Sequence, residues 1–93
     1  MRMRMDTAAG NRVLQAGKVD QLLRDFAERT KPEAAYFFPD QGKRAASFVF
    51  DMKDSSEIIA LVEPFFQEIE AEIQLTPVMN LEDLQRGLAA FSS

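Results

Sequence analysis

The first six residues alternate strictly between apolar and charged side chains. Met1, Met3 and Met5 alternate with charged neighbours, which is the period-2 pattern of a strand with one buried face. Thioethers at this spacing indicate core packing and not a soft metal site. The small residues 7–10 follow, and Asn11 is a suitable N-cap for a short helical turn that reaches residue 16.

An amphipathic helix is predicted after residue 18. Gly17 is expected to separate it from the preceding turn, because Val13 and Leu14 fall outside its apolar stripe. Pro32 ends the segment by disfavouring helix at Lys31. The stripe follows the i, i+3, i+4, i+7, i+8 spacing of a helix packed on one side, with Val19, Leu22, Leu23, Phe26 and Ala27.

Two aromatic-rich runs, 33–39 and 44–51, flank the turn residues 40–43 and predict a β-hairpin. Gly42 supplies the positive φ that such a turn requires. Both faces of the hairpin are apolar, so its register stays open. We favour the register in which the side chains on the face away from the helices are Tyr36, Phe38, Ser47 and Val49.

The second half of the chain predicts helix, strand and helix. Residues 54–57 (Asp-Ser-Ser-Glu) form a capping-box pattern before an apolar stripe, in which Pro64 predicts a kink. Residues 72–78 alternate as a fourth strand. Asn80 caps a last helix, which should pack on its own or a partner's sheet edge. That helix has the apolar stripe Leu81, Leu84, Leu88 and Phe91.

This order of elements predicts an α+β fold of the ferredoxin-like kind. Two β-α-β units joined by a hairpin, each with a right-handed crossover, give a βαββαβ sandwich with a four-stranded antiparallel-type sheet, followed by the C-terminal helix. The helices cover the methionine side of the first strand. The chain shows no repeat or linker, so residues 1–93 form a single domain.

The composition narrows the chemistry. With no Cys and no His among 93 residues, the chain cannot build a structural zinc site, a thiolate nucleophile or a Ser-His-Asp triad. The net charge of -4 and scattered basic residues argue against a nucleic-acid partner. No apolar run approaches 18 residues and no secretory signal is evident, so we expect a cytoplasmic protein with no membrane partner.

The uncovered sheet face predicts a partner subunit. It would carry charged residues of the first and fourth strands beside aromatic residues of the hairpin, and such a face is too apolar to lie fully in water. A chain of this length buries only roughly 60–65% of its unfolded surface. A homodimer is therefore expected.

The layout resembles the dimeric α+β barrel superfamily. The segment Glu72-Ile73-Gln74-Leu75-Thr76-Pro77-Val78, just after a helix containing Pro64-Phe65-Phe66, is similar to small uncharacterised bacterial proteins of the muconolactone isomerase-like kind. The resemblance implies two ferredoxin-like sheets packed face to face, with a cleft for a small organic ligand. Members that act on substrates often use His or another dedicated acid-base group. This chain has no His, so we transfer no catalytic residue.

The candidate ligand-binding residues are Arg2, Arg4, Tyr36 and Gln74. A guanidinium offers a planar fork of donors for a carboxylate or phosphate, although the arginines can instead pair across strands. Their expected partners are then Glu72, Asp6 or Asp51. The phenol of Tyr36 can orient a ligand or form a hydrogen bond across the dimer.

Other polar groups predict no further site. The carboxylates Glu33, Asp51 and Glu72 are candidate bases at strand ends, but solvated termini are the commoner role. The acidic residues Glu68, Glu70 and Glu72 do not converge as a hard cation requires. No metal and no cofactor are expected.

Three functions remain open. The first is a homodimer with a small-molecule pocket at the open sheet face, and the second is a cofactor-free isomerase or monooxygenase-like enzyme. The third is a structural or regulatory protein-interaction module. The sequence leaves undecided whether the chain is an enzyme, because the same face residues serve all three.

Overall fold

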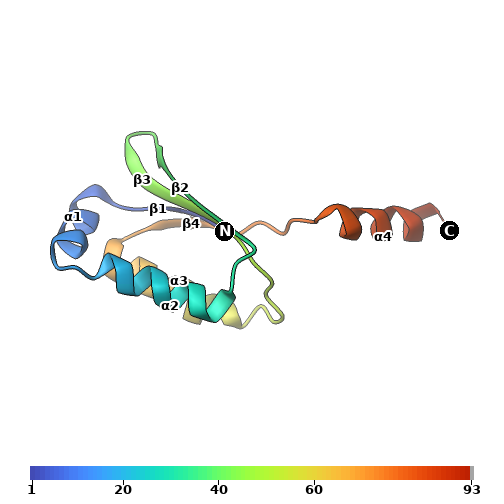
Figure 1. The fold of residues 1–93 in the computed structure, drawn as a ribbon, viewed down its shortest axis with the longest axis horizontal. Coiled ribbons are helices and arrows are strands. Elements are labelled where there is room, and N and C mark those ends of the chain that lie inside the picture. Colours follow the sequence, from blue (N-terminus) through green and yellow to red (C-terminus); the bar gives the residue numbers. More distant parts are fainter. Residues whose placement is uncertain (93) are drawn as a thin grey trace.

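The computed structural model describes residues 1–92 and contains four strands and four helices (Figure 1). In chain order these are β1 (Arg2–Arg4), α1 (Thr7–Gln15), α2 (Val19–Thr30), β2 (Ala34–Asp40), β3 (Lys43–Val49), α3 (Glu57–Ile69), β4 (Glu72–Gln74) and α4 (Leu81–Ser92). The predicted α+β class is confirmed.

The strands form one open sheet in the order β2-β3-β1-β4, and all three neighbouring pairs are antiparallel. Helices α1, α2 and α3 contact one another and lie on one side of the sheet. The other side carries no helix, and we call it the open face. Residues 1–74, which hold the sheet and these three helices, are called the body.

The core lies between the sheet and the three helices. Phe26 of α2 is central, because its ring lies 4.7 Å from that of Phe48 and 5.3 Å from that of Phe65 between centroids. Phe65 and Ile69 of α3 are almost completely buried. Met3 and Met5 are also buried, which confirms that the methionine alternation marks a core strand.

The first helix begins earlier than predicted. The expected start at Asn11 is wrong, because α1 starts at Thr7, whereas its end at Gln15 with a C-cap at Ala16 agrees with the prediction. Its N-cap is Asp6, whose carboxylate accepts a hydrogen bond from the backbone N–H of Ala9 at 2.9 Å. The small residues in this turn allow close packing, and Ala9 has no exposed surface.

The hairpin turn is tighter than expected. Only Gln41 and Gly42 separate the strands, with φ of 52° and 79°. Two central residues with positive φ give the type I′ geometry, which suits the twist of a hairpin. The favoured register is confirmed, since Tyr36 pairs with Ser47, which in turn pairs with Arg2 of β1.

Helix α3 lies where its capping-box pattern and apolar stripe predict it, whereas strand β4 is shorter than predicted. Helix α3 runs without a break from Glu57 to Ile69 and includes Pro64. Ahead of it, the Glu57 carboxylate accepts the backbone N–H of Asp54, while Asp54 accepts that of Ser56. Strand β4 covers only Glu72–Gln74 and not the predicted 72–78. Residues 75–80 leave the sheet as a linker to α4.

Helix α4 stands clear of the body at the end of this linker (Figure 1). The molecule is correspondingly elongated, with extents of 55 × 27 × 17 Å. The predicted helix and its cap are present, because the Asn80 side chain accepts the backbone N–H of Asp83 at 2.8 Å. No residue of α4 that the structure describes is buried, so the helix does not pack on its own sheet edge.

Candidate functional site

The open face carries two rows of side chains that cross all four strands. Facing partners in an antiparallel sheet point to the same side, so the register places each row on one surface. The first row is Gln74, Arg2, Ser47 and Tyr36, and the second is Glu72, Arg4, Ala45 and Phe38. Small residues of β3 therefore separate the arginines of β1 from the aromatic residues of β2.

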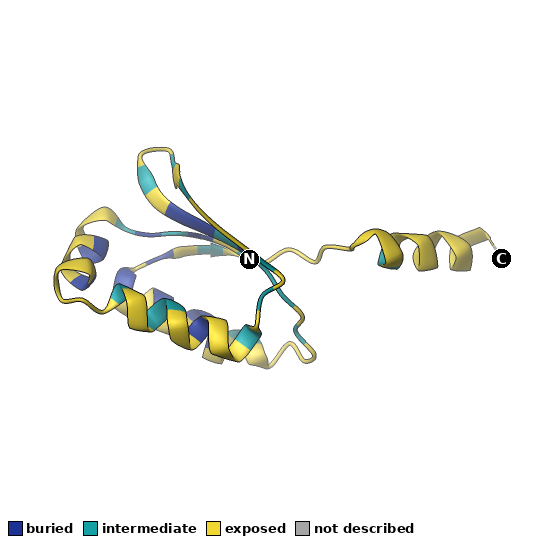
Figure 2. Ribbon diagram, viewed as in Figure 1, coloured by how far each residue is buried: buried dark blue, intermediate teal, exposed yellow. Residues whose placement is uncertain are grey.

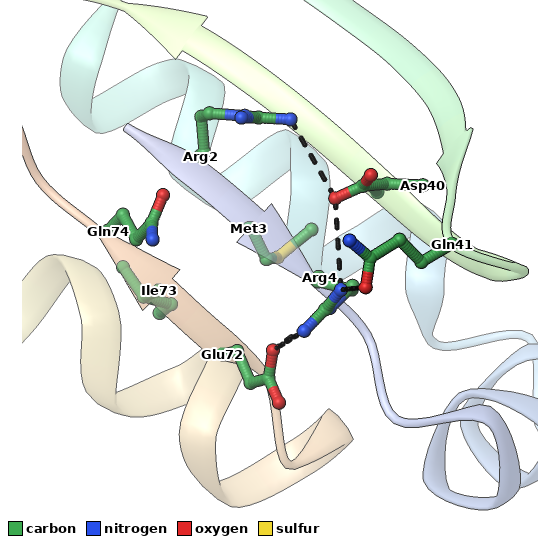
Figure 3. Close-up of a pocket in the computed structure, with 9 residues that line it drawn as sticks. Arg2, Met3, Arg4, Asp40, Gln41, Glu72, Ile73 and Gln74 are labelled. Atoms are coloured by element: carbon green, nitrogen blue, oxygen red, sulfur yellow. Dashed lines mark hydrogen bonds and ion pairs between the residues drawn. The ribbon is translucent and has the colours of Figure 1, made fainter.

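A cleft of 530 Å³ lies over the β1 and β4 side of this face (Figure 3). We call it the charged cleft. It brings together three of the predicted ligand-binding residues, Arg2, Arg4 and Gln74. Tyr36 is not among its lining residues and is 68% exposed. The polar lining also includes Asp40, Gln41 and Glu72.

The guanidinium of Arg4 is held at each of its nitrogens. Its Nε donates to Oε2 of Glu72 at 2.9 Å, and its Nη2 pairs with the same carboxylate. Its Nη1 donates to Oε1 of Gln41 at 3.0 Å and lies 3.9 Å from Oδ2 of Asp40 (Figure 3). The hydrogen-bond donors of Arg4 are thus engaged by residues of β4 and the hairpin turn.

Arg2 completes the charge balance of the cleft. Its Nη2 lies 3.7 Å from Oδ2 of Asp40, and its guanidinium carbon lies 5.7 Å from the ring centroid of Phe38. Two arginines therefore face two carboxylates, Asp40 and Glu72. Such a balanced set attracts a free anion weakly, since each positive charge already has a negative neighbour.

The structure decides among the predicted partners of the arginines. The pairing with Glu72 is confirmed, whereas Asp6 caps α1. Asp51 forms no ion pair with either arginine in residues 1–92. The sequence reasoning missed Asp40 and Gln41, although the Asp-Gln-Gly run before Lys43 was the available signal for a two-residue turn that points them toward β1.

A second depression, of 620 Å³, lies on the helix side of the hairpin. We call it the hairpin groove. Its lining is mainly apolar and also includes two basic residues, Lys43 and Arg44. The apolar lining includes Met5, Val19, Leu23, Phe37, Pro39 and Ala46. Phe37 is 62% exposed although it sits on the helix side of the sheet. The three helices of the body thus leave the inner side of β2 uncovered.

Two groups away from the charged cleft have lowered pKa values. The pKa of Asp54 is lowered mainly because its carboxylate accepts a hydrogen bond from the Ser56 backbone. A hydrogen bond from the Ser56 side chain lowers it further. The pKa of the N-terminal ammonium is lowered by partial burial. Of the predicted candidate bases, only Glu72 lines the cleft, and it is paired with Arg4.

Metal and membrane features are not found in the part of the chain that the structure describes. Among residues 1–92, no three acidic side chains converge in a way that could hold a metal ion. Within the same residues, every helix is too short or too polar to cross a membrane. Comparison with known proteins finds no matching family model, no matching curated protein and no matching solved structure.

Proposed function

We propose that this chain is a self-associating interaction module, a homodimer in which the open faces of two ferredoxin-like subunits pack together. The strand order β2-β3-β1-β4 and the antiparallel pairing of all neighbours support the ferredoxin-like assignment. The resemblance to dimeric α+β barrels supports the face-to-face arrangement. Cytoplasmic location remains part of this proposal.

The observation that carries the proposal is that the hydrogen-bond donors of Arg4 are already used within the chain. Its donors are held by Glu72 and Gln41, so an anionic ligand would have to displace an internal carboxylate to reach it. A polar group with satisfied hydrogen bonds can instead be covered by a protein surface without leaving a buried donor unpaired. The open face therefore suits a macromolecular partner better than an anion.

The aromatic side of the face supplies the apolar part of such an interface. Tyr36 is largely exposed, and Phe38 and Val49 are partly exposed beside it. Tyrosine and phenylalanine are enriched where protein surfaces meet. A symmetric pairing of two open faces would cover these residues on both subunits at once.

The test is the mass of the full chain by light scattering, with a matched pair of variants. Tyr36→Glu places a charge on the open face, and Ile59→Glu places the same charge on the outer surface of α3. The two wild-type side chains are 68% and 70% exposed. We expect Tyr36→Glu to weaken the dimer and Ile59→Glu to leave it intact. Equal behaviour of the two variants would reject the open-face interface.

A small organic ligand in the charged cleft is a second candidate, favoured by two side chains. The Gln74 amide has no hydrogen-bond partner among the described residues, and the Arg2 side chain is 58% exposed. Both can donate to a carboxylate. Titration with benzoate, followed by NMR at the Gln74 side-chain amide and the Arg2 Nε–H, should shift both signals. Unshifted signals would remove this candidate.

The isomerase or monooxygenase-like hypothesis gains no support from the cleft. Its two carboxylates, Asp40 and Glu72, are both paired with arginines. A general base must be free to reach the proton that it abstracts. Enzymatic activity therefore stays a prediction without an assigned residue.

A further inference from the structure

Helix α4 presents an apolar stripe that nothing in the described chain covers. Figure 2 shows the helix exposed along its length. The exposed fractions of its stripe are 69% for Leu81, 40% for Leu84, 57% for Leu88 and 91% for Phe91. A 12-residue helix is marginal in water on its own, because helices shorter than about 12–15 residues lack enough bonds to offset nucleation. The amphipathic pattern therefore calls for a second surface.

The hairpin groove is a surface of matching chemistry. Its lining is apolar and includes the 62% exposed Phe37, and an amphipathic helix binds such a groove through apolar residues one turn apart. Strand β2 is also a seven-residue edge strand with aromatic side chains. Edge strands of this kind are commonly protected from aggregation by a covering helix.

The charges of the two surfaces are complementary. The first turn of α4 carries Glu82 and Asp83. Asp83 is paired with Arg86 of the same helix, so Glu82 is the carboxylate that a partner surface can meet. The lining of the hairpin groove includes Lys43 and Arg44, and Arg44 also donates to Oδ1 of Asn11. Opposite charges at the edge of an apolar contact favour association and fix its orientation.

The geometry of the linker argues against docking of α4 in its own groove. Strands β4 and β2 form opposite edges of the sheet, so three strand spacings, about 14 Å, separate them. The end of β4 lies beside Arg2, whereas the groove lies at the other end of the strands near Gly42. Six linker residues, 75–80, span about 20 Å when fully extended.

An extended linker of this length reaches the chain's own hairpin groove only along a straight line through the body. The side of the sheet on which the groove opens is covered by α1, α2 and α3 between β4 and the hairpin. The remaining route crosses the whole open face and turns around the β2 edge, which is longer than the linker. The path to the groove of a second copy is set by how the two copies pack and does not have to cross the chain's own body.

We propose that α4 of one copy packs its apolar stripe into the hairpin groove of a second copy, and that the second copy returns the same contact. This exchange rests on the homodimer proposed above and adds a specific occupant for the groove. The exchange has two-fold symmetry, so the same contact buries the α4 stripe and Phe37 in both subunits.

Engineered cysteines provide the direct test, because the native chain has none. Leu88→Cys is made in one full-length chain and Phe37→Cys in another that carries a larger tag, and the mixture is oxidised mildly. We expect a disulfide-linked heterodimer on a non-reducing gel. Ala90→Cys lies on the opposite side of α4 from Leu88. Paired with Phe37→Cys, it is the matched control and should link poorly.

Each alternative placement gives a different result. Intrachain linkage in a chain carrying both Leu88→Cys and Phe37→Cys would place α4 in its own groove and overturn the proposal. Linkage only between two Leu88→Cys chains would show that the α4 helices pack on each other, which also overturns it. A dimer mass without any link to position 37 would reject this placement alone. A monomer mass would reject the homodimer as well.

A second pair of variants tests the contact without crosslinking. Leu88→Glu places a carboxylate in the proposed apolar contact, and we expect the dimer dissociation constant to rise by at least about tenfold. Ala90→Glu adds the same charge on the far side of α4 and should change the constant by less than about threefold. Equal changes in the two variants would contradict the proposed orientation of α4.

Discussion

The body and α4 follow the same sequence rule but differ in what covers them. Helix α3 and helix α4 are both amphipathic, with 13 and 12 residues. The α3 stripe lies against the sheet, with Phe65 only 1% exposed, whereas the α4 stripe ends in Phe91 at 91%. Periodicity therefore identifies which side of a helix is apolar. It does not identify the surface, or the chain, against which that side packs.

The largest effect should come from truncating matched phenylalanines in the two regions. Phe65→Ala removes a ring that contacts Phe26 in the core, and we expect it to lower the free energy of unfolding by about 3–5 kcal/mol. Phe91→Ala should change this free energy by less than about 0.5 kcal/mol in dilute, monomeric protein. Urea unfolding followed by circular dichroism measures both. Similar losses would mean that α4 is part of the body's core.

A second comparison uses the same glycine substitution in both regions. A Cβ on Gly10 of α1 would meet the side chain of Met5, with Cγ at 2.8 Å, and lie 3.2 Å from Nη1 of Arg44. We expect Gly10→Ala to destabilise the body by about 1–3 kcal/mol through overpacking.

Gly87 of α4 has open space around its would-be Cβ. Gly87→Ala should therefore favour the helix by about 0.5–1 kcal/mol, seen as stronger ellipticity at 222 nm without a lower unfolding midpoint. A loss of stability in this variant would indicate that the small residue makes a close contact in the dimer.

A third comparison removes one helix cap from each region. Asp6→Ala deletes the cap of α1 and should lower the free energy of unfolding of the body by about 1 kcal/mol. Asn80→Ala deletes the cap of α4 and should reduce helicity while leaving the unfolding midpoint of the body unchanged. A shared drop in midpoint would show that the two regions unfold together.

The smallest effect should come from the ion pair in the charged cleft. The Glu72 side chain is 63% exposed and that of Arg4 is 26% exposed, so solvent screens their attraction. A double-mutant cycle with Arg4→Met and Glu72→Gln should give a coupling of about 1 kcal/mol or less, reduced by added salt. A larger coupling that resists salt would indicate that the cleft is closed off from water in solution.

The sequence predicted the fold well where local patterns decide it. The methionine alternation identified β1. The favoured face of the hairpin is confirmed, since Tyr36 pairs with Ser47 and Ser47 with Arg2, although two apolar faces left the register open in the sequence. The start of α1 was missed because Asp6 and Asn11 are both good caps, and only the packing of Ala9 against the core selects the earlier one. Strand β4 was predicted too long, since alternation continues beyond Gln74 after its partner strand has ended.

The candidate site was predicted less completely. The sequence identified Arg2, Arg4 and Gln74, which share the cleft. It signalled the turn that holds Asp40 and Gln41 but not their approach to Arg4, because the turn and β1 lie 37 residues apart in sequence. Nor could it separate a free arginine from one that is already paired.

The mass of the unmodified full chain at micromolar concentration tests the central claim most directly. In the proposed dimer, a second copy covers both the open face and the α4 stripe. Light scattering should therefore give twice the 10.5 kDa of one chain. A mass of 10.5 kDa at micromolar concentration would contradict the proposed dimer, because both surfaces would then remain uncovered in solution.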